Sequence, residues 1–192
     1  MISENISLVF SCSAGAEWAE VRSTLGIPQI TADSSPSFRL YVGDIAAAHD
    51  RKCIDALGIT HVVNCGVADL EPHECAPHEG LRYVFVRTSD ANFAVRPAPY
   101  GTIAESENPT EQWPLAMAHL REARAAGTSA LVHCIAGANR SVTTAAVFMA
   151  LEGYAPTFAD ALRVIRSVRP QANPMRSYRE WGAAASTSLA KA

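Results

Sequence analysis

The residues best suited to chemistry lie in one short run, 133–141, which has the sequence HCIAGANRS. Five residues separate Cys134 from Arg140, and Gly137 stands between them, where the backbone can turn without a Cβ clash. The segment before this run is predicted to be a buried strand, and the segment after it a helix. Successive backbone N–H groups of such a loop, with the positive end of the helix dipole, bind a dianion. The pattern therefore predicts a phosphate-binding loop that carries a thiol.

Each polar residue of the loop has an expected role in phosphoryl transfer. Helix N-termini and neighbouring cations stabilise thiolates, so we expect Cys134 to be an ionised nucleophile. Arg140 is expected to bind two phosphoryl oxygens with its planar guanidinium, which lysine does not do. Ser141 is expected to donate its hydroxyl to the sulfur when a phosphocysteine is hydrolysed. The backbone amides expected to bind the substrate are those of Ile135, Ala136, Gly137, Ala138, Asn139 and Arg140.

The cysteines as a group indicate free thiols. The chain has five, an odd number without CxxC spacing, so neither a disulfide framework nor a zinc cluster is predicted. An inert buried Cys134 would be an ordinary core residue, but that alternative leaves Arg140 without a role. Because thiolates are prone to oxidation, a redox disulfide with Cys134 stays open, and its candidate partners are Cys53, Cys65 and Cys75. Residues 69–79 include metal-ligand types among prolines and are expected to form a solvated loop. We expect no metal and no cofactor.

The composition suits one folded domain without a membrane span. The 192 residues are 48% hydrophobic and 18% charged. A formal net charge of −3 offers nucleic acid no basic surface. The apolar stretches are far shorter than the roughly 18–20 residues that cross a bilayer, and the N-terminus lacks a basic secretory signal. We predict an intracellular protein that is cytoplasmic, with the nucleus as the alternative compartment. The sequence does not determine the oligomeric state.

Short strand-like and helix-like segments alternate along most of the chain. This alternation predicts an α/β fold with a central mixed, largely parallel sheet of about four to five strands flanked by helices. A possible helix at 14–25 precedes a turn at 33–37, so 1–37 is predicted to be an N-terminal extension and linker, 38–182 the catalytic domain and 183–192 a flexible tail. The strands are expected at 38–42, 60–65, 81–86 and 128–133, and the helices at 45–57, 114–126, 141–151, 158–168 and 174–185.

The run HCIAGANRS resembles the phosphate-binding loop of the dual specificity phosphatases, within the protein tyrosine phosphatase superfamily. Residues 38–43 resemble the opening strand of that family and 57–65 its next core strand. Its closing helical segment is similar to the stretch that contains Arg169, Pro170, Asn173 and Pro174. The resemblance covers about residues 38–181, which is most of the chain.

The resemblance implies a general acid, an aspartate on the loop after the third strand, and Asp90 matches that position. This residue would protonate the leaving oxygen and later deprotonate the attacking water. The stretch between Asp90 and the helix at Pro114 is longer than is usual in the family, so Glu105 and Glu107 remain alternative acids. The insertion, 91–110, is either a lid or rim of the site or a passive surface loop. The resemblance also favours His133 as a residue that tunes the thiolate rather than a simple core histidine.

The function predicted from these features is metal-independent hydrolysis of phosphomonoesters through a phosphocysteine. The resemblance implies phosphorylated proteins as substrates, at phosphotyrosine and phosphoserine or phosphothreonine. The same loop would also serve a phosphoinositide phosphatase, an RNA 5′-phosphatase or a non-catalytic module that binds phosphoproteins. Lipid substrates call for extra basic residues near the loop, and Ile135, Ala136 and Ala138 supply none.

Overall fold

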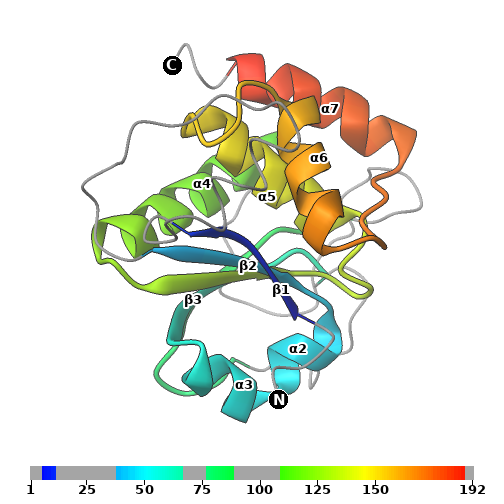
Figure 1. Cartoon of the computed structure of the whole chain (residues 1–192). Helices are drawn as coiled ribbons and strands as arrows, with labels where there is room; N and C mark the ends of the chain where they lie inside the picture. Colours follow the sequence, from blue (N-terminus) through cyan, green and yellow to red (C-terminus); the bar gives the residue numbers. More distant parts are fainter. Residues whose placement is uncertain (1–5, 12–37, 67–76, 89–108, 189–192) are drawn as a thin grey trace.

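The computed structural model describes residues 6–11, 38–66, 77–88 and 109–188, which form a sheet between two layers of helices (Figure 1). The sheet has five strands in the order β1-β2-β5-β3-β4. The first strand runs antiparallel to its neighbour and the other neighbouring pairs run parallel. The strands are β1 (Ile6–Ser11), β2 (Arg39–Gly43), β3 (Ile59–Asn64), β4 (Arg82–Phe85) and β5 (Ser129–His133). The predicted fold class is therefore confirmed.

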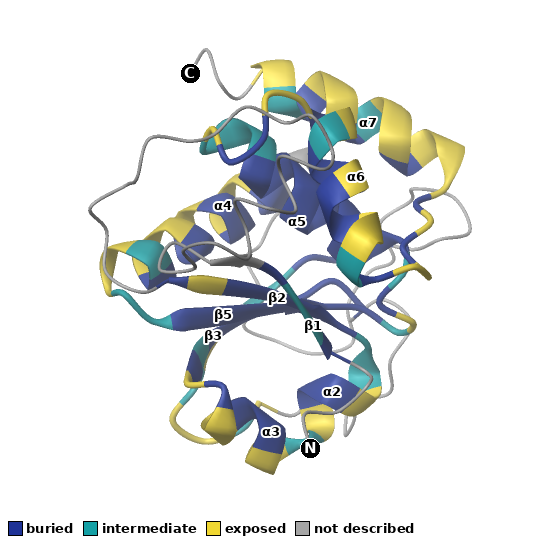
Figure 2. Ribbon diagram, in the orientation of Figure 1, coloured by how far each residue is buried: buried dark blue, intermediate teal, exposed yellow. Residues whose placement is uncertain are grey.

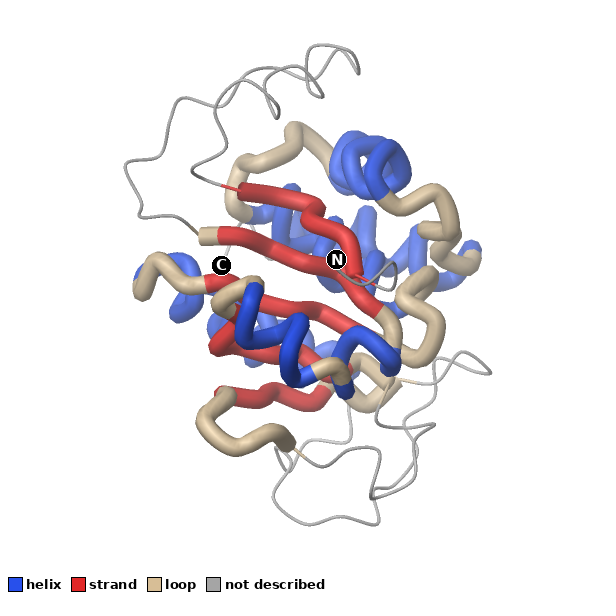
Figure 3. Tube along the Cα trace, turned by 60° about the horizontal axis from the view of Figure 1, so that its bottom comes forward, coloured by secondary structure: helices blue, strands red, loops and turns tan. Residues whose placement is uncertain are grey.

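The helices cover the two faces of the sheet unequally, as Figure 1 shows. Two short helices, α2 (Ile45–His49) and α3 (Arg51–Ala56), lie on one face, which is turned toward the viewer in Figure 3. The other face carries four longer helices, α4 (Pro109–Ala125), α5 (Arg140–Leu151), α6 (Phe158–Val168) and α7 (Arg176–Ser188). Because strand side chains alternate between faces, β3 sends Val62 to the smaller layer and Val63 to the larger one.

The main hydrophobic core lies between the sheet and the four longer helices (Figure 2). Helix α5 is the most enclosed of them, with ten successive buried residues from Arg140 to Met149. Trp113 of α4 is fully buried and its ring lies 3.8 Å from that of Trp181 in α7, centroid to centroid. The helix that follows the phosphate-loop motif is thus held on several sides, which fixes the position of its N-terminus.

Local capping explains where the structure departs from the predicted helices. The helix expected at 45–57 is two helices, because Asp50 ends α2 and its carboxylate accepts a hydrogen bond from the Cys53 amide, which starts α3. Helix α4 begins at Pro109, so that Pro114 lies inside it rather than in its first turn.

Two elements extend beyond the predicted domain boundaries. Strand β1 belongs to the stretch assigned to the N-terminal extension, yet it pairs with β2 in the sheet. Helix α7 continues to Ser188, beyond residue 182. The boundaries at 37 and 182 stay predictions, and the possible helix at 14–25 lies outside the described residues. Among the helices that the structure describes, none has both the length and the apolar character needed to cross a membrane.

Candidate active site

The phosphate-loop motif lies where the parallel strands end together. His133 is the last residue of β5, and the strand register places it beside Gly43 at the end of β2 and Asn64 at the end of β3. In open α/β sheets, ligands bind at the carboxyl ends of the strands. The loop 134–139 leaves this edge and leads directly into α5, so Cys134 is at the sheet edge and Arg140 in the first turn of the helix.

Four consecutive carbonyl groups of the loop, those of residues 135–138, all accept hydrogen bonds from the surrounding fold. Their donors are the Ile45 amide to Ile135 (3.1 Å), Arg169 Nη2 to Ala136 (3.5 Å), Arg169 Nε to Gly137 (2.6 Å) and the Asn173 amide to Ala138 (2.8 Å). No peptide bond is cis in the described residues, and in a trans peptide the C=O and N–H groups point in opposite directions. The amides of residues 136–139 therefore point to the opposite side, toward the interior of the loop, where an anion would bind.

Gly137 is required by the tight fit of this loop against the fold. Its φ of +62° lies in the left-handed region, where side chains are strained. A Cβ at this position would collide with the Arg169 guanidinium and would come within 2.7 Å of the Gly43 carbonyl oxygen. The absence of a side chain thus allows Arg169 to reach the loop carbonyls.

The two residues with the central predicted roles are both buried beside the loop. Cys134 is 2% exposed, and its Sγ lies 3.2 Å from the Ser141 hydroxyl oxygen. Arg140 is also 2% exposed, and its Nη1 donates a hydrogen bond of 3.0 Å to the Thr88 carbonyl. The thiol, the hydroxyl and the guanidinium are therefore held by the same turn of backbone.

A second set of hydrogen bonds, centred on the Thr144 hydroxyl, holds the first turn of α5. The Thr144 hydroxyl donates to the Arg140 carbonyl (3.0 Å) and accepts from the Trp113 indole (3.1 Å). Because the single hydroxyl proton of Thr144 is engaged, the Cys65 thiol, 3.4 Å away, is the donor in that pair. Burial raises the pKa of Cys65 to about 12, and the nearby Cys134 acts in the same direction, so Cys65 is a neutral thiol.

His133 and Asn139 contribute to the site without offering charge. Burial lowers the pKa of His133 to about 4, and Arg140 and His49 act in the same direction, while a hydrogen bond with the Cys134 backbone opposes them. The ring beside the thiol is therefore neutral at pH 7. Asn139 precedes α5 but does not cap it, because its side-chain oxygen accepts a hydrogen bond from the Met175 amide (2.9 Å).

The remaining predicted residues are only partly covered by the structure. Residues 89–108 lie outside the described part of the chain. This stretch contains Asp90, the alternative acids Glu105 and Glu107, and most of the insertion 91–110. Among the candidate redox partners, Cys65 donates its amide to the His133 carbonyl (2.7 Å), whereas Cys53 lies in the core on the other face of the sheet. Cys75 is not described.

Sequence analysis did not assign a role to Arg169. The residue is fully buried, and its Nη1 also donates to the Val42 carbonyl (3.5 Å) and to the Ser7 hydroxyl (3.3 Å). Its guanidinium thus joins the loop to β1 and β2. The only signal in the sequence was the resemblance around Arg169 and Pro170, which indicates a family position but not its contacts.

Comparison with known proteins decides the family. The family described as "Dual specificity phosphatase, catalytic domain" matches residues 40–182. The chain belongs to the dual specificity phosphatases. It is 30% identical over 138 residues to human "Dual specificity protein phosphatase 22", an alignment that covers 70% of this chain and 63% of that protein. This dual specificity phosphatase chain thus spans about three fifths of the length of that curated relative.

Solved structures share the fold of this dual specificity phosphatase. Human DUSP28 matches with a TM-score of 0.59 and 22% identity, covering 78% of this chain and 89% of that one. PTPMT1 in complex with PI(5)P matches with a TM-score of 0.61 and 15% identity, covering 79% and 92%. At these identities the similarity establishes the fold alone.

The buried neutral state of His133 predicts a pH-dependent contribution to stability. Its pKa is about 4 in the folded protein against 6.5 ordinarily, so the unfolded chain binds more protons below pH 6.5. Stability is therefore lost as the pH falls from 6.5 toward 4, by up to about 3 kcal/mol. We expect His133→Gln to reduce this slope in urea unfolding measured across that pH range, while the part that remains comes from His61 and His119, whose pKa values burial also lowers.

The matched control is Val132→Ala, which changes the buried neighbour of His133 without removing a titratable group. It should lower stability at every pH and keep the wild-type slope. If His133→Gln kept that slope as well, the histidine would not be the group responsible.

Proposed function

We propose that this chain hydrolyses phosphomonoesters through a phosphocysteine formed on Cys134. The observation that supports this most directly is the outward bonding of the carbonyls of residues 135–138, which turns the following amides to the side where a phosphoryl group would lie. Membership of the dual specificity phosphatases supports a cysteine-based phosphatase. The alignment with human Dual specificity protein phosphatase 22 covers 63% of that protein. The activity and the substrate are therefore proposed for this chain.

The proposed reaction has two steps. The Cys134 thiolate attacks phosphorus, the bond to the leaving oxygen breaks, and Asp90 gives that oxygen its proton. Asp90 then takes a proton from water, which attacks the phosphocysteine and releases phosphate and the thiolate. Arg140 and the loop amides bind the equatorial oxygens in both steps, and Ser141, 3.2 Å from the sulfur, donates its hydroxyl to the departing thiolate.

Chain connectivity supports Asp90 as the acid. The Arg140 guanidinium donates to the carbonyl of Thr88, only two residues before Asp90. Two residues of extended chain span at most about 7 Å, so chain connectivity allows Asp90 to serve the phosphoryl group that Arg140 would bind. Glu105 and Glu107 precede Gln112, which accepts a hydrogen bond from the Arg87 amide, so at least five residues of chain separate them from this region.

Phosphorylated proteins are the proposed substrates, at tyrosine and at serine or threonine. The loop positions between the cysteine and the arginine carry Ile135, Ala136 and Ala138, which add no positive charge for a polyanionic lipid head group. A fold neighbour, PTPMT1, has been solved with PI(5)P, so a phosphoinositide is the second candidate. Phosphotyrosine, phosphothreonine and phosphoinositide substrates compared at equal concentration are expected to rank the protein substrates first. A preference for the lipid would replace this assignment and leave the reaction type unchanged.

Replacing the nucleophile tests the reaction itself. Cys134→Ser is expected to abolish release of an aryl alcohol from its phosphate, because a serine hydroxyl is not ionised at neutral pH. The loop amides and Arg140 remain, so the variant should still bind tungstate in calorimetry. The matched control, Cys53→Ser, changes a buried cysteine on the other face of the sheet and should keep activity. Turnover by Cys134→Ser would disprove the phosphocysteine, and a wild type that binds tungstate without turnover would indicate a binding module.

Replacing the acid tests the role of Asp90. Asp90→Asn is expected to lower kcat by about 10²–10⁴-fold on a substrate with a poor leaving group, because protonation of that group is lost. The loss should shrink for a nitrophenyl phosphate, whose phenolate leaves without a proton. Glu105→Gln and Glu107→Gln serve as comparison variants and should behave as wild type. A leaving-group-dependent loss in either of them, and not in Asp90→Asn, would transfer the role to that residue.

A further inference from the structure

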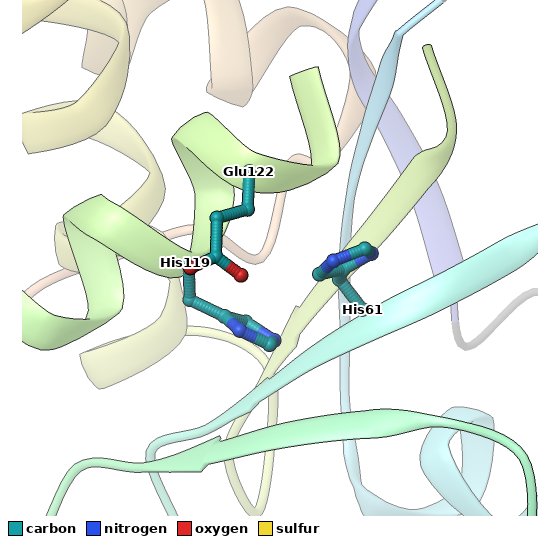
Figure 4. A group of neighbouring side chains, drawn as sticks. All are labelled: His61, His119 and Glu122. Carbon is teal, nitrogen blue, oxygen red and sulfur yellow. The ribbon is translucent and has the colours of Figure 1, made fainter. Parts of the chain in front are cut away.

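A cluster of metal-ligand side chains lies between β3 and α4 (Figure 4). His61, His119 and Glu122 each offer one ligand atom, and these atoms all lie within 4.8 Å of one another. His61 pairs with Ala130 at the start of β5, whereas the phosphate loop follows the other end of that strand at His133. The cluster is therefore separate from the proposed active site.

The fold brings the three residues together from two elements. His119 and Glu122 are three residues apart on α4, a spacing that puts them on one face of a helix. His61 projects from the face of β3 against which α4 packs, and its ring centroid lies 4.8 Å from that of His119. Both imidazoles are buried, whereas the Glu122 side chain is 52% exposed, so the carboxylate is the ligand group in contact with solvent. A cation would thus reach the cluster from solvent.

The hydrogen bonds of His61 show which of its two ring nitrogens carries the free lone pair. Arg82 Nη1 lies 3.3 Å from Nε2 of the ring, and because a guanidinium only donates, Nε2 is the acceptor. The proton of the neutral ring is then on Nδ1, which donates to the Thr60 hydroxyl at 2.8 Å. That hydroxyl in turn donates to Thr128 (2.8 Å). Metal-binding histidines usually donate the N–H of the ring nitrogen that does not bind the metal to a nearby acceptor. His61 does the same through Nδ1, which leaves Nε2 as its ligand atom.

His119 is held in the same manner. Its Nε2 lies 3.2 Å from the Arg82 carbonyl oxygen, which only accepts, so Nε2 carries the proton and Nδ1 the lone pair. Burial lowers the pKa of both histidines, that of His61 to about 4, so the two rings are neutral at pH 7. Two neutral imidazoles and one carboxylate form the donor set N₂O, which suits Zn²⁺ rather than Mg²⁺ or Ca²⁺.

A cation already occupies part of this cluster. The guanidinium of Arg82 contacts His61 Nε2 at 3.3 Å and Glu122 Oε2 at 2.8 Å, two of the three candidate ligand atoms. Both members of this salt bridge are more than half exposed, with side-chain exposures of 62% and 52%. Exposed pairs of this kind contribute little to stability, so Arg82 can leave at small cost. Arg82 and a metal ion would therefore exclude each other.

We propose that His61, His119 and Glu122 form a Zn²⁺ site with water as the fourth ligand. Tetrahedral zinc with bonds of about 2.0–2.1 Å requires ligand atoms roughly 3.4 Å apart. The ligand atoms here lie within 4.8 Å of one another, so they must move closer by at most about 1.4 Å. The ion would join β3 to α4 and stabilise the fold without touching the phosphoryl group. The site revises the sequence-based expectation of no metal, which overlooked the pair His119 and Glu122.

Zinc binding is tested on the full chain carrying Cys134→Ser, so that the reactive thiol cannot bind the ion. After chelator treatment, Zn²⁺ is titrated by calorimetry, and Co²⁺ by its visible absorption. We expect one strong site whose Co²⁺ spectrum lacks the near-ultraviolet thiolate band, and a melting temperature that rises with Zn²⁺. A thiolate band at the first equivalent would assign the metal to cysteines and overturn the site.

Four further substitutions in this background distinguish the ligands from their surroundings. His119→Ala and Glu122→Gln should each weaken Zn²⁺ binding by about tenfold or more. Arg82→Met removes the competing cation and should strengthen binding severalfold. His49→Ala, at an exposed histidine outside the cluster, is the matched control and should bind as the parent does. Because Glu122 is exposed, Glu122→Gln is expected to fold, and an affinity equal to that of the parent would disprove the proposal.

Discussion

The geometry of a trans peptide is the constraint on which this site depends. A backbone loop binds a dianion only if several N–H groups point inward, and each of them can do so only if the carbonyl of the same peptide points outward. Outward carbonyls buried in a fold need donors, because an unpaired buried C=O costs free energy comparable to a lost hydrogen bond. Residues 135–138 meet this requirement with donors from three residues, Ile45, Arg169 and Asn173, which belong to two separate parts of the chain.

Arg169 connects the loop to the rest of the fold. It caps two of the four carbonyls and also contacts β1 and β2, so the loop is aligned with the sheet as well as with α5. The contacts are possible because Gly137 has no side chain. Burial keeps His133 and Cys65 uncharged at neutral pH. The local groups suited to stabilise negative charge are therefore Arg140, the amide dipoles and Arg169, which interacts electrostatically with Cys134.

The local sequence pattern predicted which helices and strands flank the site more accurately than it predicted the residues at which they begin and end. The buried strand before Cys134 and the apolar helix after Arg140 were recognisable as continuous apolar runs bounded by glycines, and the structure buries every residue of the strand and ten successive residues of the helix. The break at Asp50 was missed because a single capping carboxylate decides it. The early start of α4 was missed because Pro114 is tolerated inside that helix, although proline ordinarily marks a first turn. Strand β1 was assigned to the N-terminal extension rather than to the sheet, since its partner strand lies well beyond it along the chain.

The amino-acid sequence by itself was enough to predict the candidate pair, Cys134 and Arg140, because their spacing and the intervening glycine are local properties of one loop. It also determined the family and the α/β class. Only the tertiary structure decided what holds that loop, namely the side chain of Arg169 and the amides of Ile45 and Asn173. The same is true of the meeting of His61 with His119 and Glu122. These contacts join residues that are distant in sequence, and the packing of helices on a sheet fixes such distances while no local spacing encodes them.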